Sequence, residues 1–368
     1  MLWFGFGYKG FGQVALGEDL ISSLPEVVKL KGAEVGDSMI SRVIPSWSYT
    51  AFLTEDGSVL LSGFVGGCHV PYLCLPGIKC LDLLPTENVI ILQFTDCVKC
   101  WAVNTLSPLL MHEKSVWKMD TCAGHNVAFP LVANGHIIPQ APFFRQLPTK
   151  CSAHKLVLGN EHVVLITTEG TLLTWGAGRH GQLGHGDLED VQDPRIVDAL
   201  HGVVMVDAAA GGWHSVGLSE GGDIYCWGWN ESGQLGLPSK ALAQEKANTE
   251  EAPTGADPAE ASEFITIQAF PALIDLPHES EVIKISCGSR HTAAVTGSGD
   301  LYTWGWGKYG QLGHGNTMSL DHPQRVEYFS QNQLCVKEVS CKHWKTYVRC
   351  HQKIISAGLN HNDNGATI

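Results

Sequence analysis

A glycine-rich phrase recurs along the chain and constrains its fold more than any other feature. Its clearest copies begin at Trp175, Trp227 and Trp304, and each continues within a few residues into Gly-Gln-Leu-Gly. A worn copy occupies residues 3–13. One unit of this size cannot bury its own apolar face, so a recurring unit predicts several copies stacked against one another.

The spacing of the copies predicts the number of units. Gly181 and Gly233 lie 52 residues apart, and 368 residues divided by 52 is close to seven. Each clear unit contains short apolar runs separated by acid-plus-glycine turns such as Thr168-Glu169-Gly170, a pattern typical of antiparallel hairpins. Short strands repeated in this way favour a β-propeller. The sequence therefore predicts an all-β, seven-bladed propeller over residues 1–358.

The units at the ends of the chain and in its first half are less regular. Residues 337–350 contain only the first two strands of a unit, and residues 3–13 resemble a third strand. We therefore expect the N-terminal strand to pair in the C-terminal blade and close the propeller, which removes a free sheet edge. Residues 117–138 are expected to form the weakest blade, and the polar residues 359–368 a flexible tail.

One insertion interrupts the repeat. Gly233 and Gly310 lie 77 residues apart, which exceeds the regular spacing of 52 by 25. The extra residues fall at about 239–265 and are rich in Ala, Pro, Glu and Thr, which predicts a disordered acidic insertion. We interpret its acidic part, 243–263, as a solvated spacer, with a contact to a basic partner as the alternative. The formal net charge of −13 disfavours direct binding to DNA.

Several short motifs suggest chemistry that the repeat explains better. Gly176-Ala177-Gly178-Arg179-His180-Gly181 fits a dinucleotide-binding fingerprint, but that fingerprint needs a following helix, and Gln-Leu-Gly follows instead. Cys97-Val98-Lys99-Cys100 lacks the second cysteine pair of a metal site, and the twelve cysteines are expected to be reduced. Neither a membrane span nor a catalytic motif is evident. We therefore expect a protein that is not an enzyme and needs no cofactor or metal.

Histidine recurs at one position of the repeat. His162, His214 and His291 each begin an apolar run, and Lys345 and Tyr49 occupy the same position in other units. A zinc site would need the imidazoles to converge, whereas copies in different blades lie apart around a ring. We expect each side chain to bond a neighbouring backbone carbonyl, at about 1 kcal/mol per bond.

Aromatic and charged residues of the glycine-rich phrase form the predicted contact surface. Trp175, Trp227 and Trp304 end apolar runs and are expected to pack between blades, whereas Trp229 and Trp306 lie two residues farther toward the loop. Tryptophan and arginine dominate the energetics of protein interfaces. The predicted partner-binding residues are Arg179, His180, Trp229, Asn230, Trp306, Lys308 and Tyr309.

The chain resembles the regulator of chromosome condensation repeat family. The similarity rests on Gly-Gln-Leu-Gly-His-Gly in two copies of the phrase and on the runs Gly211-Gly212-Trp213-His214-Ser215 and Gly288-Ser289-Arg290-His291-Thr292. This resemblance implies a seven-bladed propeller. Residues 3–7, 46–52, 227–235 and 325–329 further resemble a small vertebrate branch of the family.

That branch implies a chromatin-associated adaptor without catalytic activity. The implied partner is a JmjC-domain oxygenase that acts as a histone demethylase or hydroxylase, with histones as a further candidate and no membrane contact. The implied roles are control of histone methylation at centromeric satellite repeats, transcriptional repression, chromosome segregation and spindle organisation, in the nucleus. At the arginine that the oxygenase would target, this chain has Gln140, with Arg145 nearby.

The founding member of the family implies an alternative function, guanine-nucleotide exchange for the Ran GTPase. That member has a basic N-terminal tail that binds nucleosomes. This chain begins directly with an expected blade strand and is acidic overall. The sequence therefore favours the adaptor over the exchange factor.

Overall fold

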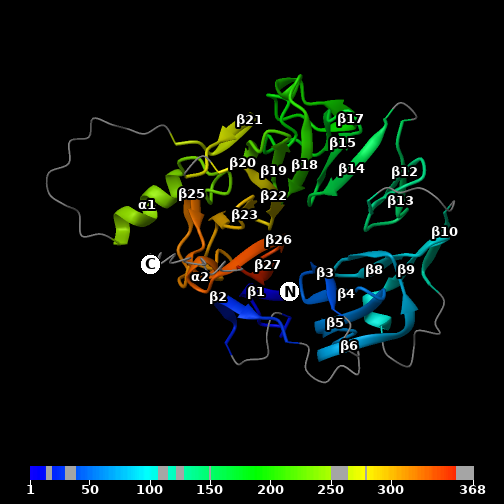
Figure 1. Cartoon of the computed structure of the whole chain (residues 1–368). Helices are drawn as coiled ribbons and strands as arrows, with labels where there is room; N and C mark the ends of the chain where they lie inside the picture. Colours follow the sequence, from blue (N-terminus) through cyan, green and yellow to red (C-terminus); the bar gives the residue numbers. More distant parts are fainter. Residues whose placement is uncertain are drawn as a thin grey trace, which may run out of the picture.

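Seven antiparallel sheets follow one another around a central axis in the computed structural model (Figure 1). The structure describes residues 1–13, 19–29, 39–106, 115–121, 128–148, 151–249, 264–277 and 280–353. Six sheets have four strands, and one has three strands within these residues. The predicted seven-bladed all-β propeller is confirmed. The blades are numbered 1 to 7 below, starting with the sheet that begins at Ile40.

Blades 4, 5 and 6 follow the sequence repeat closely, and their strands pair in consecutive order. Blade 4 consists of β14 (Ala153–Leu158), β15 (His162–Thr167), β16 (Leu172–Gly176) and β17 (Val191–Ile196). Blade 5 consists of β18 (Met205–Ala210), β19 (His214–Ser219), β20 (Ile224–Trp229) and β21 (Ile267–Ile274). Blade 6 consists of β22 (Val282–Cys287), β23 (His291–Thr296), β24 (Leu301–Gly305) and β25 (Leu320–Arg325).

Blade 7 joins the two ends of the chain, as the sequence predicts. Its strands are β26 (Leu334–Lys342), β27 (Lys345–Gln352), β1 (Leu2–Tyr8) and β2 (Ile21–Val27). β1 pairs with β27 in antiparallel register, with Phe4 opposite Val348. The N-terminal strand therefore closes the ring.

The first half of the chain forms blades 1 to 3. Blade 1 consists of β3 (Ile40–Pro45), β4 (Tyr49–Thr54), β5 (Ser58–Val65) and β6 (Cys68–Lys79). Blade 2 consists of β7 (Asp82–Pro85), β8 (Val89–Gln93), β9 (Cys97–Ala102) and β10 (Trp117–Asp120). Blade 3 consists of β11 (Leu131–Val132), β12 (Gly135–Ile137) and β13 (Phe144–Gln146). The boundary predicted for the weakest blade, 117–138, is wrong, because Trp117 pairs with Cys100 in blade 2.

Among the described residues, four helical segments lie between strands: η1 (Val103–Thr105), η2 (Asp198–Leu200), α1 (Lys240–Thr249) and α2 (Glu327–Gln331). Helix α1 corrects the prediction of disorder for residues 240–249 of the insertion expected at about 239–265. Its sequence is rich in the helix formers Ala, Lys, Gln and Glu, and the buried side chain of Leu242 anchors it. Residues 250–263 and the predicted tail 359–368 lie outside the described residues.

Tryptophans at the ends of third strands pack between blades. Trp227 of blade 5 is fully buried among blade 4 residues such as Val164 and Leu172. Its Nε1 donates a hydrogen bond to the Gln182 carbonyl of blade 4 at 2.9 Å. Gly184 lies so close that a Cβ there would come 2.9 Å from that nitrogen, and its φ is +80°. The Gly-Gln-Leu-Gly phrase is therefore shaped to receive the tryptophan of the next blade.

Candidate partner-binding face

The repeated histidines form hydrogen bonds between neighbouring blades. His162 Nε2 lies 2.8 Å from Ser215 Oγ of the next blade, and His214 Nε2 lies 3.1 Å from Thr292 Oγ1. His291 continues the series, with Nε2 2.9 Å from Oγ1 of Thr346. The expected partner, a backbone carbonyl, is therefore wrong for the histidines, because a hydroxyl of the next blade stands in its place.

The other side chains at this repeat position do bond carbonyls. Lys345 Nζ donates to the carbonyls of Ser46 at 2.5 Å and Trp47 at 2.9 Å, and Tyr49 Oη donates to the Thr86 carbonyl at 2.9 Å. Their longer side chains reach the backbone of the next blade directly. For these two residues the expected bond is confirmed.

The hydroxyl partners determine the proton position on the histidines. Ser215 Oγ donates its only proton to the Gln182 carbonyl at 2.8 Å, so it accepts from His162 and Nε2 carries the imidazole proton. Thr292 makes the corresponding bond to Gln234 at 2.7 Å. Burial lowers the pKa of His214 to about 3, which keeps its ring neutral. Among the described residues, no group of three or more His, Cys, Asp or Glu side chains could hold a metal ion.

Aromatic side chains gather at the end of the blades where the loop before each second strand meets the loop after each third strand. In blades 4 and 5, the Trp229 ring lies 5.3 Å from Trp213 and 5.5 Å from His180, measured between ring centroids. The Arg290 guanidinium of blade 6 lies 4.5 Å from the Trp229 centroid, a favourable cation–π contact. The three rings are half-buried, so they present polarizable surface to solvent.

The next blades continue this arrangement. The Trp306 ring lies 5.0 Å from Tyr309 and 4.5 Å from Trp344 of blade 7, and Tyr309 lies 5.2 Å from Tyr8. Trp344 packs on Trp306 as Arg290 packs on Trp229. Arg290 and Trp344 occupy the same repeat position, immediately before the first residue of a second strand. We call this surface the aromatic face; its residues are His180, Trp213, Trp229, Arg290, Trp306, Tyr309, Trp344, Tyr8, Phe11 and Phe64.

The structure brings most of the predicted contact residues to this face. Trp229 packs with His180, and Trp306 packs with Tyr309. Exposed Arg179 pairs with Glu161 beside Trp213. The remaining two predicted residues have other roles.

Lys308 and Asn230 differ from the expectation. Lys308 pairs with Glu245 of helix α1, so the insertion reaches the edge of the aromatic face. Asn230 is fully buried, and its Nδ2 donates to the carbonyls of Leu237 and Ile265, each at 2.9 Å. Asn230 therefore holds the loop in place, and its buried side chain is not available to contact a partner protein.

Trp213, Arg290, Trp344 and Tyr8 also lie on the aromatic face, and the sequence alone did not single them out. The first three stand immediately before the recurring His or Lys. This repeat position holds a different residue type in several units, so the sequence pattern alone did not mark it. Tyr8 is the blade 7 equivalent of Trp229 and Trp306. Aligning the worn N-terminal copy with the others would have identified it.

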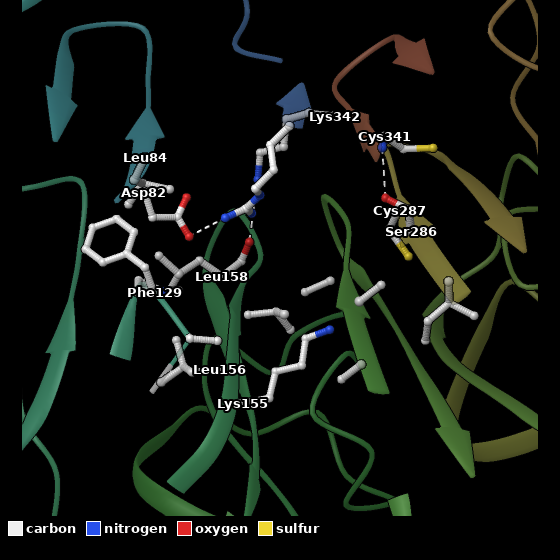
Figure 2. A pocket seen from close by; sticks show the side chains of 18 residues that line it. Asp82, Leu84, Phe129, Lys155, Leu156, Leu158, Ser286, Cys287, Cys341 and Lys342 are labelled. Carbon is white, nitrogen blue, oxygen red and sulfur yellow. Dashed lines mark hydrogen bonds and ion pairs between the residues drawn. The ribbon is translucent and has the colours of Figure 1, made fainter. Parts of the chain in front are cut away.

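The centre of the propeller holds a cavity of about 470 Å³, lined by the first strands of the blades (Figure 2). Lys155 and Lys342 extend into it from β14 and β26. Lys155 pairs with Asp207, and Lys342 Nζ lies 3.5 Å from the Leu158 carbonyl. Burial lowers the pKa of Lys342. Burial also raises the pKa of the nearby Cys341 thiol to about 12, so this thiol is not activated as a nucleophile.

No helix among the described residues is both long enough and apolar enough to cross a membrane. The Cys97 and Cys100 side chains are buried free thiols on β9. Burial raises the pKa of Cys100 to about 11. Gln140, the residue in place of the expected arginine, lies in the turn between β12 and β13, and Arg145 is exposed on β13.

Comparisons with known proteins agree with this architecture. A model of the regulator of chromosome condensation (RCC1) repeat matches residues 169–218, 221–295 and 298–346. RCC1 domain-containing protein 1 of Homo sapiens is 43% identical over 95% of this chain and 97% of its own length. The Mus musculus protein of the same name is 43% identical over 94% and 96%. The crystal structure of Prp20p from Saccharomyces cerevisiae has the same fold, with a TM-score of 0.70 and 19% identity, covering 96% of this chain and 92% of Prp20p.

Proposed function

Since the chain belongs to the regulator of chromosome condensation repeat family, we propose that it is a non-catalytic adaptor that binds a partner protein through the aromatic face. One observation carries this proposal: half-buried aromatic rings and an arginine continue from blade to blade at one end of the propeller. Aromatic and arginine side chains supply most of the binding energy in protein interfaces.

The packing of the face favours protein binding over small-molecule chemistry. Trp213, Trp229 and His180 lie with centroids within 6 Å of one another, so they leave no slot for a planar ligand between them. Their orientation is fixed by mutual contact, which reduces the side-chain entropy lost on binding. A preorganised set of half-buried rings suits contact with another protein.

We propose that the partner is a JmjC-domain oxygenase and that the complex acts at nuclear chromatin. Its roles would be control of histone methylation at centromeric satellite repeats, transcriptional repression, chromosome segregation and spindle organisation. Support comes from the resemblance of residues 3–7, 46–52, 227–235 and 325–329 to the vertebrate branch. Gln140 offers the oxygenase no guanidinium, so the proposal concerns binding and not hydroxylation at that position.

Two further candidate functions, histone binding and nucleotide exchange, are suggested by Prp20p, a protein of the same fold. The structure of Prp20p was described together with its binding to Gsp1p and histones. We propose histones as a further partner of the complex. Nucleotide exchange on a Ran-type GTPase is the second candidate function, because the likeness to Prp20p extends over 96% of this chain.

A binding assay with matched variants tests the aromatic face. Trp229→Ala combined with Trp306→Ala removes the two central rings and is expected to weaken binding of a purified JmjC-domain oxygenase by 100-fold or more, with the fold intact. Trp117→Ala is the control, because that half-buried tryptophan lies on β10, outside the face. Equal binding by the double variant would place the contact elsewhere.

The exchange-factor candidate has its own assay. We expect no acceleration of GDP release from Ran by the wild-type protein. If the wild-type protein accelerates GDP release, nucleotide exchange would replace the adaptor role as the proposed function. This holds whether or not the Trp229→Ala, Trp306→Ala variant keeps that activity.

A further inference from the structure

Within the part of the chain that the structure describes, the outer edge of blade 3 is unpaired. The other blades have four strands, whereas the described residues of blade 3 form β11, β12 and β13 in that order. β13 pairs with β12 and has no second neighbour among the described strands. Figure 1 shows β12 and β13 beside β14 of the next blade. An unpaired edge presents N–H and C=O groups that template the addition of another strand.

The register identifies the backbone groups that face this edge. The Leu147 N–H donates to the Asn134 carbonyl at 3.0 Å, on the β12 side. Hydrogen-bonding direction alternates along an antiparallel strand, so Arg145 also turns its backbone toward β12. The N–H and C=O groups of Phe144 and Gln146 therefore point outward, where a fourth strand would pair.

A cavity of about 540 Å³ lies beside this edge. Arg145 and Gln146 bound it on blade 3, and Trp175 and the segment 192–194 of β17 bound it on blade 4. Neighbouring blades stack face to face, so the space between β13 and β17 is where a fourth strand of blade 3 would lie. The cavity lies beside the position that such a strand would take.

His136 is the second, independent observation at this site. Its side chain is 1% exposed and lines the cavity. Neither of its ring nitrogens has a hydrogen-bond partner among the described residues, and a buried polar group without a partner destabilises a protein. Arg145 lies directly opposite His136 on the paired strand, so both side chains lie on the same face of the blade.

We propose that blade 3 binds an extended segment of a partner protein, which adds a fourth strand to β13 and directs one carboxylate side chain into the cavity. The segment bonds the free backbone groups of Phe144 and Gln146. Its aspartate or glutamate accepts hydrogen bonds from Arg145 and His136.

Charge complementarity selects an acidic side chain. Arg145 forms no ion pair within the described residues, so its guanidinium is available to a carboxylate. Asp193 bounds the opposite side of the cavity and repels a carboxylate placed there, which directs the side chain toward Arg145. This site lies on a blade that contributes nothing to the aromatic face, and the inference goes beyond the proposed function.

Selection from a displayed library of random nonapeptides on the full-length protein tests the proposal. We expect the enriched peptides to carry one Asp or Glu flanked by β-branched or aromatic residues. A synthetic peptide from this set should bind at least 10-fold more weakly to Gln146→Pro, which lacks the outward N–H, and to Arg145→Ala. Arg195→Ala, an exposed arginine on β17, is the matched control and should bind normally.

Amide hydrogen exchange gives a second readout that does not depend on variants. Exchange at Phe144 and Gln146 should slow at least 100-fold when the peptide binds, while Arg145, already turned toward β12, changes little. Peptides that bind Gln146→Pro and Arg145→Ala as tightly as the wild type would overturn the proposal. So would an unproductive selection.

Two further variants show whether the chain's own end or the aromatic face takes part in peptide binding. Binding that emerges only after removal of residues 354–368 would mean that the chain's own end takes the fourth-strand position, and would overturn the partner proposal. The Trp229→Ala, Trp306→Ala variant should keep its peptide affinity. Failure of the aromatic face and failure of the blade 3 site are therefore distinguishable.

Discussion

His214 in blade 5 and His136 in blade 3 are both buried imidazoles on second strands, yet their surroundings differ. His214 donates to a hydroxyl of the next blade, and that hydroxyl donates to a carbonyl of the glycine-rich phrase in His214's own blade, so three segments are joined. The ring nitrogens of His136 have no hydrogen-bond partner among the described residues; the ring packs edge to face with Trp175 and lines a cavity. The recurring histidines of the regular blades join one blade to the next, whereas the His136 imidazole of blade 3 lines a cavity.

The largest effect should come from removing a tryptophan that packs between regular blades. Trp304 is fully buried against blade 5, so Trp304→Ala should lower the free energy of unfolding by about 3–5 kcal/mol. Trp117→Ala in the irregular half should cost half of that or less, because its ring is half-buried. Denaturant titration of both variants measures the difference. Equal losses would mean that the two halves are packed alike.

The two histidines should respond in opposite ways to the same substitution. His214→Leu removes a satisfied bond and should destabilise the protein by about 1–3 kcal/mol. His136→Leu replaces a buried polar group that has no partner among the described residues, so stability should stay the same or increase. Thermal unfolding of the His214→Leu and His136→Leu variants measures both changes in stability. A comparable loss in both variants would show that His136 has a structural bond after all.

The buried histidines should also make stability depend on pH. Burial lowers the pKa of His162 to about 4 and of His214 and His291 to about 3, below the ordinary value of 6.5. Between pH 6.5 and 4 the unfolded chain binds protons that the folded protein does not, so stability falls as the pH falls. Each histidine contributes a slope of up to about 1.4 kcal/mol per pH unit.

His214→Gln isolates one of these contributions. As the pH falls from 6.5 to 4, the free energy of unfolding of the variant should decrease less steeply than that of the wild type. The difference in slope should correspond to about one proton fewer bound on unfolding. Denaturant unfolding at four pH values gives both slopes. Parallel curves would show that His214 is protonated in the folded state.

The smallest effects are expected from two surface arginines. Arg290→Ala removes the cation–π contact with Trp229 and should cost about 0.5–1 kcal/mol. Arg145→Ala removes a side chain without an ion-pair partner among the described residues and should change stability by less than about 0.5 kcal/mol. Calorimetry of the two variants compares them. A larger loss for Arg145→Ala would indicate that Arg145 supports blade 3 itself.

The repeat made the fold predictable. Glycines in tight turns, tryptophans at strand ends and the recurring Gly-Gln-Leu-Gly report local geometry that each unit needs, so blades 4 to 6 and the closure by β1 followed from their spacing. Blade 3 was misplaced because its strands are two to three residues long, too short for an alternating pattern. Helix α1 was missed because acidic composition outweighed its local helix propensity.

The candidate site could be predicted only in part. Trp229 and Trp306 could be placed on the aromatic face from the sequence, because they follow the apolar strand pattern by two residues, toward a loop. Asn230 was misassigned, since its role depends on the Leu237 and Ile265 carbonyls, which loop folding brings to it. The covering of Trp229 by Arg290 joins residues 61 positions apart, a contact that only the packing of adjacent blades creates.

The proposed contact between the aromatic face and its partner can be located residue by residue. Amide hydrogen exchange of the complex with a purified JmjC-domain oxygenase tests it most directly. Binding through the aromatic face should slow amide exchange in the segments 177–181, 211–214, 228–232 and 305–310 and leave the opposite end of the blades unchanged. Protection confined to that opposite end, or to the strands around the central cavity, would contradict it.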